Sequence, residues 1–212
     1  MKFEAKAVRG AVKIKFIKGS LSRFDGKVLS VGCAEKGRLT RRRFVLLMRK
    51  IISLAKQNKL ASIAVDFKDI KALAPKDFTD HEAGKITAIA FVMAAYEHDT
   101  YKTKAKDAYA SVEAAALIGI SNEGVEGAKR GHSTGDAVNA ARELANTPGG
   151  DMTPTVLAQA AKAAAKTAGA GSQLKVTVLG RKEMTKLGMG AVLGVAKGSA
   201  EEPQFIDRKS VV

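Results

Sequence analysis

The stretch "GDAVNAARELANTPGGDMTP" (Gly135–Pro154) decides how this chain is organised. A helix is predicted to run through 135–146 and to end before Pro148, because proline cannot continue a helix. Thr153 is a good N-cap, and Pro154 suits the first position of a second helix. We therefore predict a boundary near residue 150, with one domain at 1–150 and another that starts at residue 151.

The residues before this break alternate between strand patterns and helix patterns. Period-two alternation and short apolar runs predict the strands, whereas apolar residues on one face of a 3.6-residue repeat predict the helices. In chain order we expect a strand at 12–16, a strand at 27–32, a helix from about Thr40, a strand at 62–67, a helix at 81–98, a strand at 113–120 and the helix through 135–146. This alternation predicts an α/β domain with a mostly parallel sheet covered by helices.

A shorter pattern follows the break. We expect an alanine-rich helix from Pro154 to about Gly169, a strand at 174–180, a short helix at 181–190, an extended glycine-punctuated segment at 191–198 and a strand that begins at Gln204. A unit of about 60 residues buries only a thin core. We therefore interpret 151–206 as the incomplete start of a larger α/β domain.

The chain carries a formal net charge of +15, from 36 Lys and Arg against 21 Asp and Glu. A charge this high raises the question of an anionic partner. The one basic cluster is "RRRFVLLMRK" (Arg41–Lys50), and the other basic residues are spread along the chain. With no Trp, 3 Tyr and 8 Phe, the sequence is poor in the aromatic residues of a platform for single-stranded nucleic acid. We therefore favour a solvated basic surface over a nucleic-acid site.

Cys33 is the only cysteine, so neither a disulfide framework nor a cysteine-rich metal site is expected. Its place after an apolar run favours a small buried residue over a nucleophile. No apolar stretch approaches the roughly 20 residues of a membrane span. The N-terminal "MKFEAKAVRGAVKIKF" (Met1–Phe16) lacks the apolar run of a signal peptide. We expect no membrane association and a cytoplasmic location.

Two glycine-containing stretches match nucleotide-binding loops only in part. "GCAEKGRL" (Gly32–Leu39) lies between a strand and a helix, but Leu39 stands where a phosphate-binding loop needs Ser or Thr to bind magnesium. "GMGAVLGVAKG" (Gly188–Gly198) follows a helix instead of a strand, so a dinucleotide site is rejected. We interpret the first as a plain turn and the second as glycines that allow close packing or a bend.

The spacing of polar residues indicates no catalytic centre. His81, His98 and His132 are far apart, and no pair has the i, i+4 spacing of a zinc-binding helix. The segment 97–99 is interpreted as a solvated helix end, and the acidic pair 201–202 fits a loop because neighbours in extended chain point to opposite faces. We therefore assign no catalytic, metal-binding or cofactor-binding residue.

Three landmarks occur in the order typical of leucyl, or cytosol, aminopeptidases. "NTP" (146–148) follows a helix and precedes "MTPTVLA". "LGMGAVLGVAKGS" (187–199) comes next, and "EPQFI" (202–206) leads into the following strand. On these motifs the chain resembles this family. In addition, "KVLSVGCAEKGRLTRRR" (27–43) is similar to a strand, loop and helix of the family's N-terminal domain.

The resemblance implies a three-layer N-terminal α/β domain and a C-terminal catalytic domain of the zinc-exopeptidase kind. It implies an enzyme, a metalloaminopeptidase that removes N-terminal residues such as leucine from peptides. Two divalent metal ions, Zn or Mn, would activate the attacking water. Members of the family are typically cytoplasmic homohexamers. The residues 146–148 match the family's interdomain turn, which we interpret as structural.

The family's metal ligands are a Lys, several Asp and a Glu, on a "GKG-T-FD-GG"-like and an "NTDAEGR"-like stretch. Both follow the strand that Gln204 begins, and neither occurs in residues 1–212. We therefore expect a fragment that binds no metal and is inactive alone. Two alternatives stay open: a basic nucleic-acid-binding module, and a non-catalytic module that forms oligomers through its N-terminal domain.

The last six residues, "DRKSVV" (Asp207–Val212), break the apolar pattern that "QFI" begins. The codons GAT CGG AAG AGC GTC GTG TAG encode the same six residues and a stop, and they match a common sequencing-library adapter. We expect 207–212 to be a non-native tail and leave it out of the fold prediction.

Overall fold

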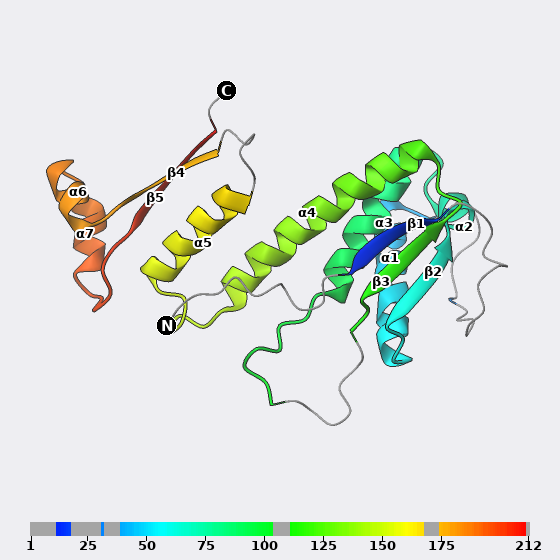
Figure 1. Cartoon of the computed structure of the whole chain (residues 1–212), viewed down its shortest axis with the longest axis horizontal. Helices are drawn as coiled ribbons and strands as arrows, with labels where there is room; N and C mark the ends of the chain where they lie inside the picture. The colour runs from blue at the N-terminus through cyan, green and yellow to red at the C-terminus, as the bar shows by residue number, and fades with distance from the viewer. Residues whose placement is uncertain (1–11, 18–30, 32–38, 104–110, 168–173, 211–212) are drawn as a thin grey trace. The chain divides into compact units, whose positions relative to one another are not determined.

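The computed structural model describes residues 12–17, 31, 39–103, 111–167 and 174–210 (Figure 1). The chain divides into two compact units: Ala7–Glu143 forms one, here the N-terminal unit, and Leu144–Val212 belongs to the other, the C-terminal unit. The strand expected at 27–32, the "GCAEKGRL" turn before Leu39 and Cys33 lie outside the described residues, except that Val31 is described.

A parallel sheet organises the N-terminal unit. It consists of β1 (Lys13–Ile17), β2 (Ser62–Asp66) and β3 (Ala114–Ile118) in the order β1-β3-β2, and both pairings are parallel. The predictions of strands at 12–16, 62–67 and 113–120 are confirmed, as is the parallel sheet. The alanine-rich segment becomes the central strand because β3 is buried almost throughout, where small and apolar side chains fit between neighbouring layers.

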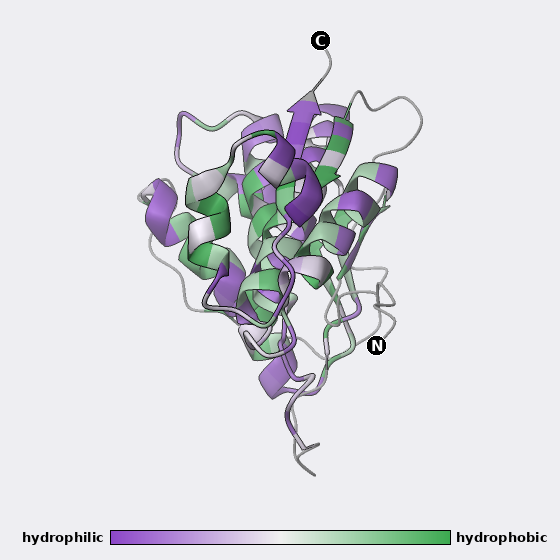
Figure 2. Cartoon of the chain, turned by 90° about the vertical axis from the view of Figure 1, so that its left-hand side faces the viewer, coloured by the Kyte–Doolittle hydropathy of each residue, from purple (hydrophilic) through white to green (hydrophobic). Residues whose placement is uncertain are grey.

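In the described part of this unit, four helices accompany the sheet. They are α1 (Arg41–Gln57), α2 (Phe67–Leu73), α3 (Asp80–Ala95) and α4 (Asn122–Asn146). As predicted, Thr40 caps α1: its hydroxyl accepts the Arg43 backbone N–H. The buried residues of α1 and α3 form one core with Ala115 and Leu117 of β3. The hydropathy colouring in Figure 2 shows that helices of this chain carry both hydrophobic and hydrophilic positions.

Two helices of the N-terminal unit differ from the sequence prediction. The short helix α2 was not predicted; it follows β2 directly because the Asp66 carboxylate accepts the Lys68 backbone N–H and starts a new helix. The helix predicted to run through 135–146 is confirmed as the second half of α4, which begins at Asn122. Several glycines in its first half weaken the helical signal, since glycine is a poor helix former.

Those glycines lie where α4 crosses α3 at very short distance. A Cβ placed on Gly127 would lie 2.0 Å from the His81 carbonyl oxygen, and one on Gly131 would lie 2.2 Å from the Lys85 carbonyl oxygen. Only glycine allows two helix backbones to approach so closely. The contact with α3 therefore supplies the stability that the local sequence of α4 lacks.

The C-terminal unit contains three helices and an antiparallel strand pair among its described residues. The elements are α5 (Pro154–Thr167), β4 (Leu174–Leu179), α6 (Arg181–Lys186), α7 (Gly190–Ala196) and β5 (Phe205–Ser210). The helix from Pro154 and the two strands are confirmed. The helix expected at 181–190 ends at Lys186, where Gly188 with φ of 68° turns the chain.

The prediction of an extended segment at 191–198 is wrong. Residues Gly190–Ala196 form α7, in which the Leu193 backbone N–H donates to the Met189 carbonyl oxygen. Gly190 and Gly194 have no atom within 4 Å of an added Cβ. These glycines therefore serve neither close packing nor a bend, and the apolar residues between them support a short helix.

Candidate functional site

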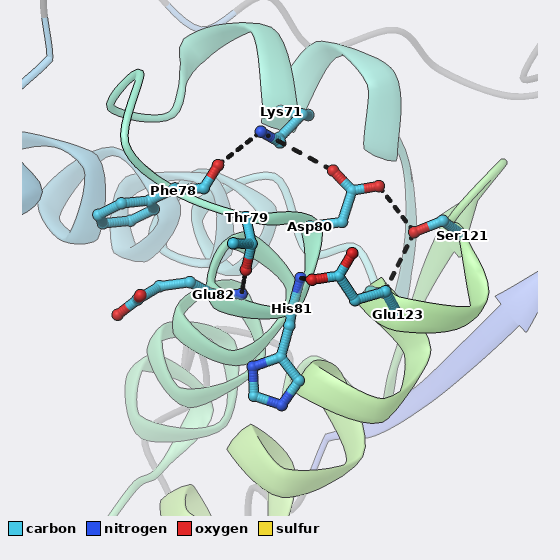
Figure 3. A network of polar contacts seen from close by, with 9 residues as sticks. Lys71, Phe78, Thr79, Asp80, His81, Glu82, Ser121 and Glu123 are labelled. Atoms are coloured by element: carbon cyan, nitrogen blue, oxygen red, sulfur yellow. Dashed lines mark hydrogen bonds and ion pairs between the residues drawn. The ribbon is translucent and has the colours of Figure 1, made fainter.

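The carboxyl ends of β2 and β3 lie beside the first residues of α3 and α4. In open α/β sheets this edge is where ligands bind. A depression with a volume of about 500 Å³ lies here and is lined by Phe67, Lys68, Lys71, Ala72, Asp80, Gly119 and Ser121. Figure 3 shows the polar side chains around it.

Asp80, the first residue of α3, is at the centre of this polar network (Figure 3). The Ser121 hydroxyl donates to Asp80 Oδ2 at 2.7 Å, and Lys71 Nζ lies 3.8 Å from Asp80 Oδ1. Lys71 Nζ also donates to the Phe78 carbonyl oxygen at 2.6 Å. Lys71 thus links α2 to the loop that leads into α3.

Side chains of this network cap the first turns of α3 and α4 and link the two helices. Ser121 Oγ accepts the Gly124 backbone N–H at 3.2 Å while it donates to Asp80 of α3. In return, Glu123 of α4 accepts the His81 backbone N–H at 3.4 Å. Carboxylates are favourable at helix N-termini, where unpaired N–H groups create a partial positive charge. The network therefore fixes the crossing of the two helices.

This arrangement does not favour nucleophilic catalysis. Ser121 donates its proton to a carboxylate, and its oxygen has no hydrogen bond to a histidine ring or lysine amine of the described residues. A serine nucleophile needs a general base that is itself held by a third group. We interpret the network as a structural junction at the carboxyl edge of the sheet.

A second polar network lies at the other end of α3 and was missed by sequence reasoning. Asn139 Nδ2 donates to the Val92 carbonyl oxygen at 3.0 Å, and Arg142 Nη1 donates to the Met93 carbonyl oxygen at 3.1 Å. The Arg142 guanidinium also lies 4.1 Å from the centre of the Tyr96 ring. These side chains of α4 satisfy carbonyl groups that the end of a helix leaves unpaired.

The structure does not bring the three histidines together in one site. His81 lies in the first turn of α3, His98 Nδ1 lies 3.2 Å from Glu143 Oε2, and His132 Nε2 lies 3.0 Å from the Val12 carbonyl oxygen. Residues 97–99 follow α3 and are half-buried, so the expectation of a solvated helix end is wrong. Among the described residues, no group of three or more His, Cys, Asp or Glu could hold a metal ion.

Two sequence motifs of the C-terminal unit have local structural roles. In the turn after α4, the Pro148 carbonyl oxygen accepts the backbone N–H groups of Asp151 and Met152. Of the acidic pair 201–202, Glu202 forms an exposed ion pair with Arg181 at 3.0 Å. Both observations agree with the interpretation of these segments as a turn and a loop. No described helix is long and apolar enough to cross a membrane.

The parallel-sheet unit and the second compact unit, with its helices and antiparallel strand pair, place the chain in the α/β class. Two family models match successive parts of it: the N-terminal domain of the cytosol aminopeptidase family at residues 14–105 and the catalytic domain of the same family at residues 139–209. The chain belongs to the cytosol aminopeptidase family, which is a family of peptidases.

Curated relatives carry the name "Probable cytosol aminopeptidase". The protein from Rhizobium etli (strain CIAT 652) is 36% identical over 67% of this chain and 28% of its own length. The protein from Alkalilimnicola ehrlichii is 40% identical over 56% of this chain and 24% of its own length. The protein from Brucella suis biovar 1 is 30% identical over 95% of this chain and 42% of its own length. The matches therefore span well under half of the length of these relatives.

Solved structures share the fold. A tomato leucine aminopeptidase mutant has a TM-score of 0.67 at 24% identity and covers 79% of this chain and 32% of its own. The bottromycin maturation enzyme BotP in complex with Mn has a TM-score of 0.65 at 24% identity, over 82% of this chain and 34% of its own. The predicted α/β fold with a parallel sheet is confirmed by this likeness.

Proposed function

We propose that this chain is the leading part of a cytoplasmic aminopeptidase that removes N-terminal amino acids from peptides. The observation that carries the proposal is that the family's N-terminal domain and its catalytic domain match successive parts of the chain. The landmark "NTP" at 146–148 begins at the last residue of α4 and lies within the part of the chain that the catalytic-domain model matches. The family name and the chemistry of its members support a peptide as the substrate class.

The complete enzyme would use two divalent metal ions, Zn or Mn. The bottromycin maturation enzyme BotP, which shares the fold, has been solved in complex with Mn, and this supports a divalent metal in the fold family. The described residues of this chain do not fit such a centre, because none of them form a cluster of metal-ligating side chains. We therefore assign no metal ligand to this chain and expect residues 1–212 to be inactive alone.

The exposed apolar surface of the C-terminal unit supports its role as part of a larger catalytic domain. Among its described residues, Ala158 and Met184 are the buried hydrophobic ones. Val195 of α7 is 85% exposed, and Leu187, just after α6, is 65% exposed. An isolated two-stranded sheet is marginal in water, so further segments that cover β4, β5 and α7 would be needed for a stable domain. We propose that the remainder of a catalytic domain covers these faces.

A chimaera tests this proposal. Residues 1–206 are joined to the part of the Brucella suis relative that follows its match to Ile206, and hydrolysis of leucyl-p-nitroanilide is measured with Mn²⁺. We expect turnover by the chimaera, loss of turnover with EDTA, and no turnover by the 212-residue chain above a metal-only blank. Turnover by the chain alone would overturn the assignment of no metal ligand. A folded but inactive chimaera would overturn the proposed function.

The junction at Ile206 also excludes the segment that we propose to be non-native. Asp207 pairs with Thr177 and Arg208 with Val176 in the β4–β5 ladder. Any residue except proline can form the backbone hydrogen bonds of such a ladder, so the pairing does not depend on these side chains. Genomic DNA that encodes Asp207–Val212 in frame would refute the proposal of a non-native tail. The mass of the active chimaera in solution tests the homohexamer that the family resemblance implies.

A further inference from the structure

We propose that the outward face of α1 binds the phosphate backbone of a nucleic-acid duplex. The binding surface, here the α1 cation stripe, consists of Arg42, Arg43, Arg49 and Lys50. This binding is independent of peptide hydrolysis and needs only the N-terminal unit.

The four cations of the stripe lie together on the side of α1 that faces away from the core. All four are exposed, and so is Leu46 between them at 52%. At 100° per residue they fall within about 60° on either side of Leu46. The buried residues of α1 lie on the opposite side: Phe44, Leu47, Met48, Ile52 and Ala55. The helix contains no acidic residue.

The cations of α1 differ in whether they have a partner. Arg41 forms an ion pair with Glu82 at 3.0 Å, and Lys56 forms one with Glu97 at 2.9 Å. Within the described part of the chain, no ion pair is recorded for any member of the α1 cation stripe. Arg49 has a contact of 3.9 Å from Nη2 to the Met93 sulfur. Among the described residues, the stripe therefore presents four positive charges to solvent without an ion-pair partner.

Two of these cations lie at a position of α1 where a positive charge destabilises a helix. Cations near a helix N-terminus are unfavourable, and Arg42 and Arg43 lie in the first turn of α1, which has no acidic residue. In contrast, α3 begins with Asp80 and includes Glu82 in its first turn. Residues that break a local stability rule are expected at functional sites. Helix stability does not explain the stripe, whereas an anionic partner does.

The structure favours a duplex over other anionic partners. A membrane-binding helix inserts its apolar face, but the apolar face of α1 is buried in the core. Protein interfaces are centred on buried aromatic or aliphatic anchors, and Leu46 is the single apolar residue within the stripe. No aromatic residue lies among the four cations to stack on bases. The partner that matches these cations is the phosphate backbone of a duplex, because arginine binds a phosphate through two N–H groups.

The length of the stripe suits several phosphates of one strand. Arg42 and Lys50 are separated by about 12 Å along the helix axis at 1.5 Å per residue. A strand of B-form DNA presents one phosphate per roughly 3.4 Å of its axis, so three to four phosphates lie within reach. Contacts of this kind are independent of base sequence and sensitive to salt.

Fluorescence anisotropy with a labelled 20-base-pair DNA duplex of arbitrary sequence tests the proposal. The full chain is titrated at 50 to 200 mM salt, and log affinity is plotted against log salt. Four phosphate contacts contribute a slope of about −3.6, which corresponds to roughly 150-fold weaker binding over a fourfold rise in salt. The stripe variant carries Arg42→Gln, Arg43→Gln, Arg49→Gln and Lys50→Gln. We expect its slope to be shallower by about 3 to 4 and its affinity at 50 mM salt to be at least tenfold weaker.

A charge-matched control tests whether weaker binding results from loss of the stripe or from the lower net charge. It replaces four exposed lysines of α5 and α6 with glutamine, at Lys162, Lys166, Lys182 and Lys186. We expect this control to change the slope by less than 1. Equal losses in the two variants, or no binding by the unaltered chain at 50 mM salt, would overturn the proposal.

Tighter binding to phosphatidylglycerol vesicles or to polyglutamate than to the duplex would also overturn it, in favour of those partners. Circular dichroism confirms that each variant is folded. We expect the stripe variant to melt at the same or a higher temperature than the unaltered chain, because cations are removed from the first turn of α1.

Discussion

The crossing of α3 and α4 gives the most direct test of how this fold is held together. In Gly127→Ala, the new Cβ would lie 2.0 Å from the His81 carbonyl oxygen and 2.7 Å from its carbonyl carbon. Both contacts are with backbone atoms inside the first turn of a helix, so no side-chain rotation can relieve them. The two helices must separate or bend before an alanine can be accommodated.

The size of the effect follows from two opposed contributions. An ordinary carbon–oxygen contact is about 3.2 Å, so the helices must move apart by roughly 1 Å, and overpacking of this kind costs up to about 3 kcal/mol. Replacing glycine by alanine inside a helix contributes about 1 kcal/mol in the opposite direction. We therefore expect Gly127→Ala to lower the free energy of unfolding by about 2 kcal/mol.

Urea unfolding followed by circular dichroism at 222 nm measures this change. The matched control is Ser133→Ala, which creates the same residue on an exposed position of α4. We expect the control to change the free energy of unfolding by less than about 0.5 kcal/mol. If Gly127→Ala is as stable as the unaltered chain, the close approach of α3 and α4 is refuted.

Three further predictions concern single polar residues. Asn139→Leu leaves the Val92 carbonyl oxygen without its donor, so the free energy of unfolding should fall by about 2 kcal/mol in urea titrations. Ser121→Ala removes the N-cap hydroxyl of α4 and should cost about 1 kcal/mol, whereas Ser121→Thr should restore most of it. The hydrogen bond and charge of Lys129 lower the pKa of Glu126, so Lys129→Gln should raise that pKa toward its ordinary value in a carboxyl NMR titration. Because the folded-state pKa of Glu126 is lowered, its small contribution to stability is present above the ordinary carboxyl pKa and is lost as pH falls through the lowered one.

Each of these predictions has a definite contrary result. An Asn139→Leu variant of unchanged stability would mean that water satisfies the Val92 carbonyl oxygen. Equal stability of Ser121→Ala and Ser121→Thr would show that the hydroxyl does not cap α4. An unchanged pKa of Glu126 in Lys129→Gln would contradict the assignment of Lys129 as the cause of the shift.

Local sequence patterns predicted elements whose stability is local or whose burial is complete. Thr40 and the apolar stripe from Phe44 to Ala55 predicted α1, because an N-cap and a one-sided apolar face are encoded within a few turns. The alanine-rich β3 was predicted from its length and its flanking glycines. Thr153 and Pro154 predicted the start of α5 for the same reason as Thr40. In each case the residues that predict the element lie within it or directly beside it in the sequence.

The first half of α4 was not predicted because its stability comes from another helix, and α7 was predicted wrongly because its helical signal is weak. The glycines of α4 weaken the helical pattern of its own sequence. They are needed because the α3 backbone lies too close for a larger residue. Helix α7 has glycine at its start and near its end, so its sequence does not distinguish a short helix from extended chain. The polar junction at Asp80 and Ser121 was missed because its two residues are 41 positions apart.

The sequence by itself determined the family and the α/β class, since those depend on ordered motifs and on periodicity along the chain. Only the tertiary structure decided which cations of the chain are paired. Arg41 and Lys56 lie on the flank of α1 that faces α3, whereas the α1 cation stripe faces solvent. Charge is a property of the residue, but compensation of charge depends on which helices pack together.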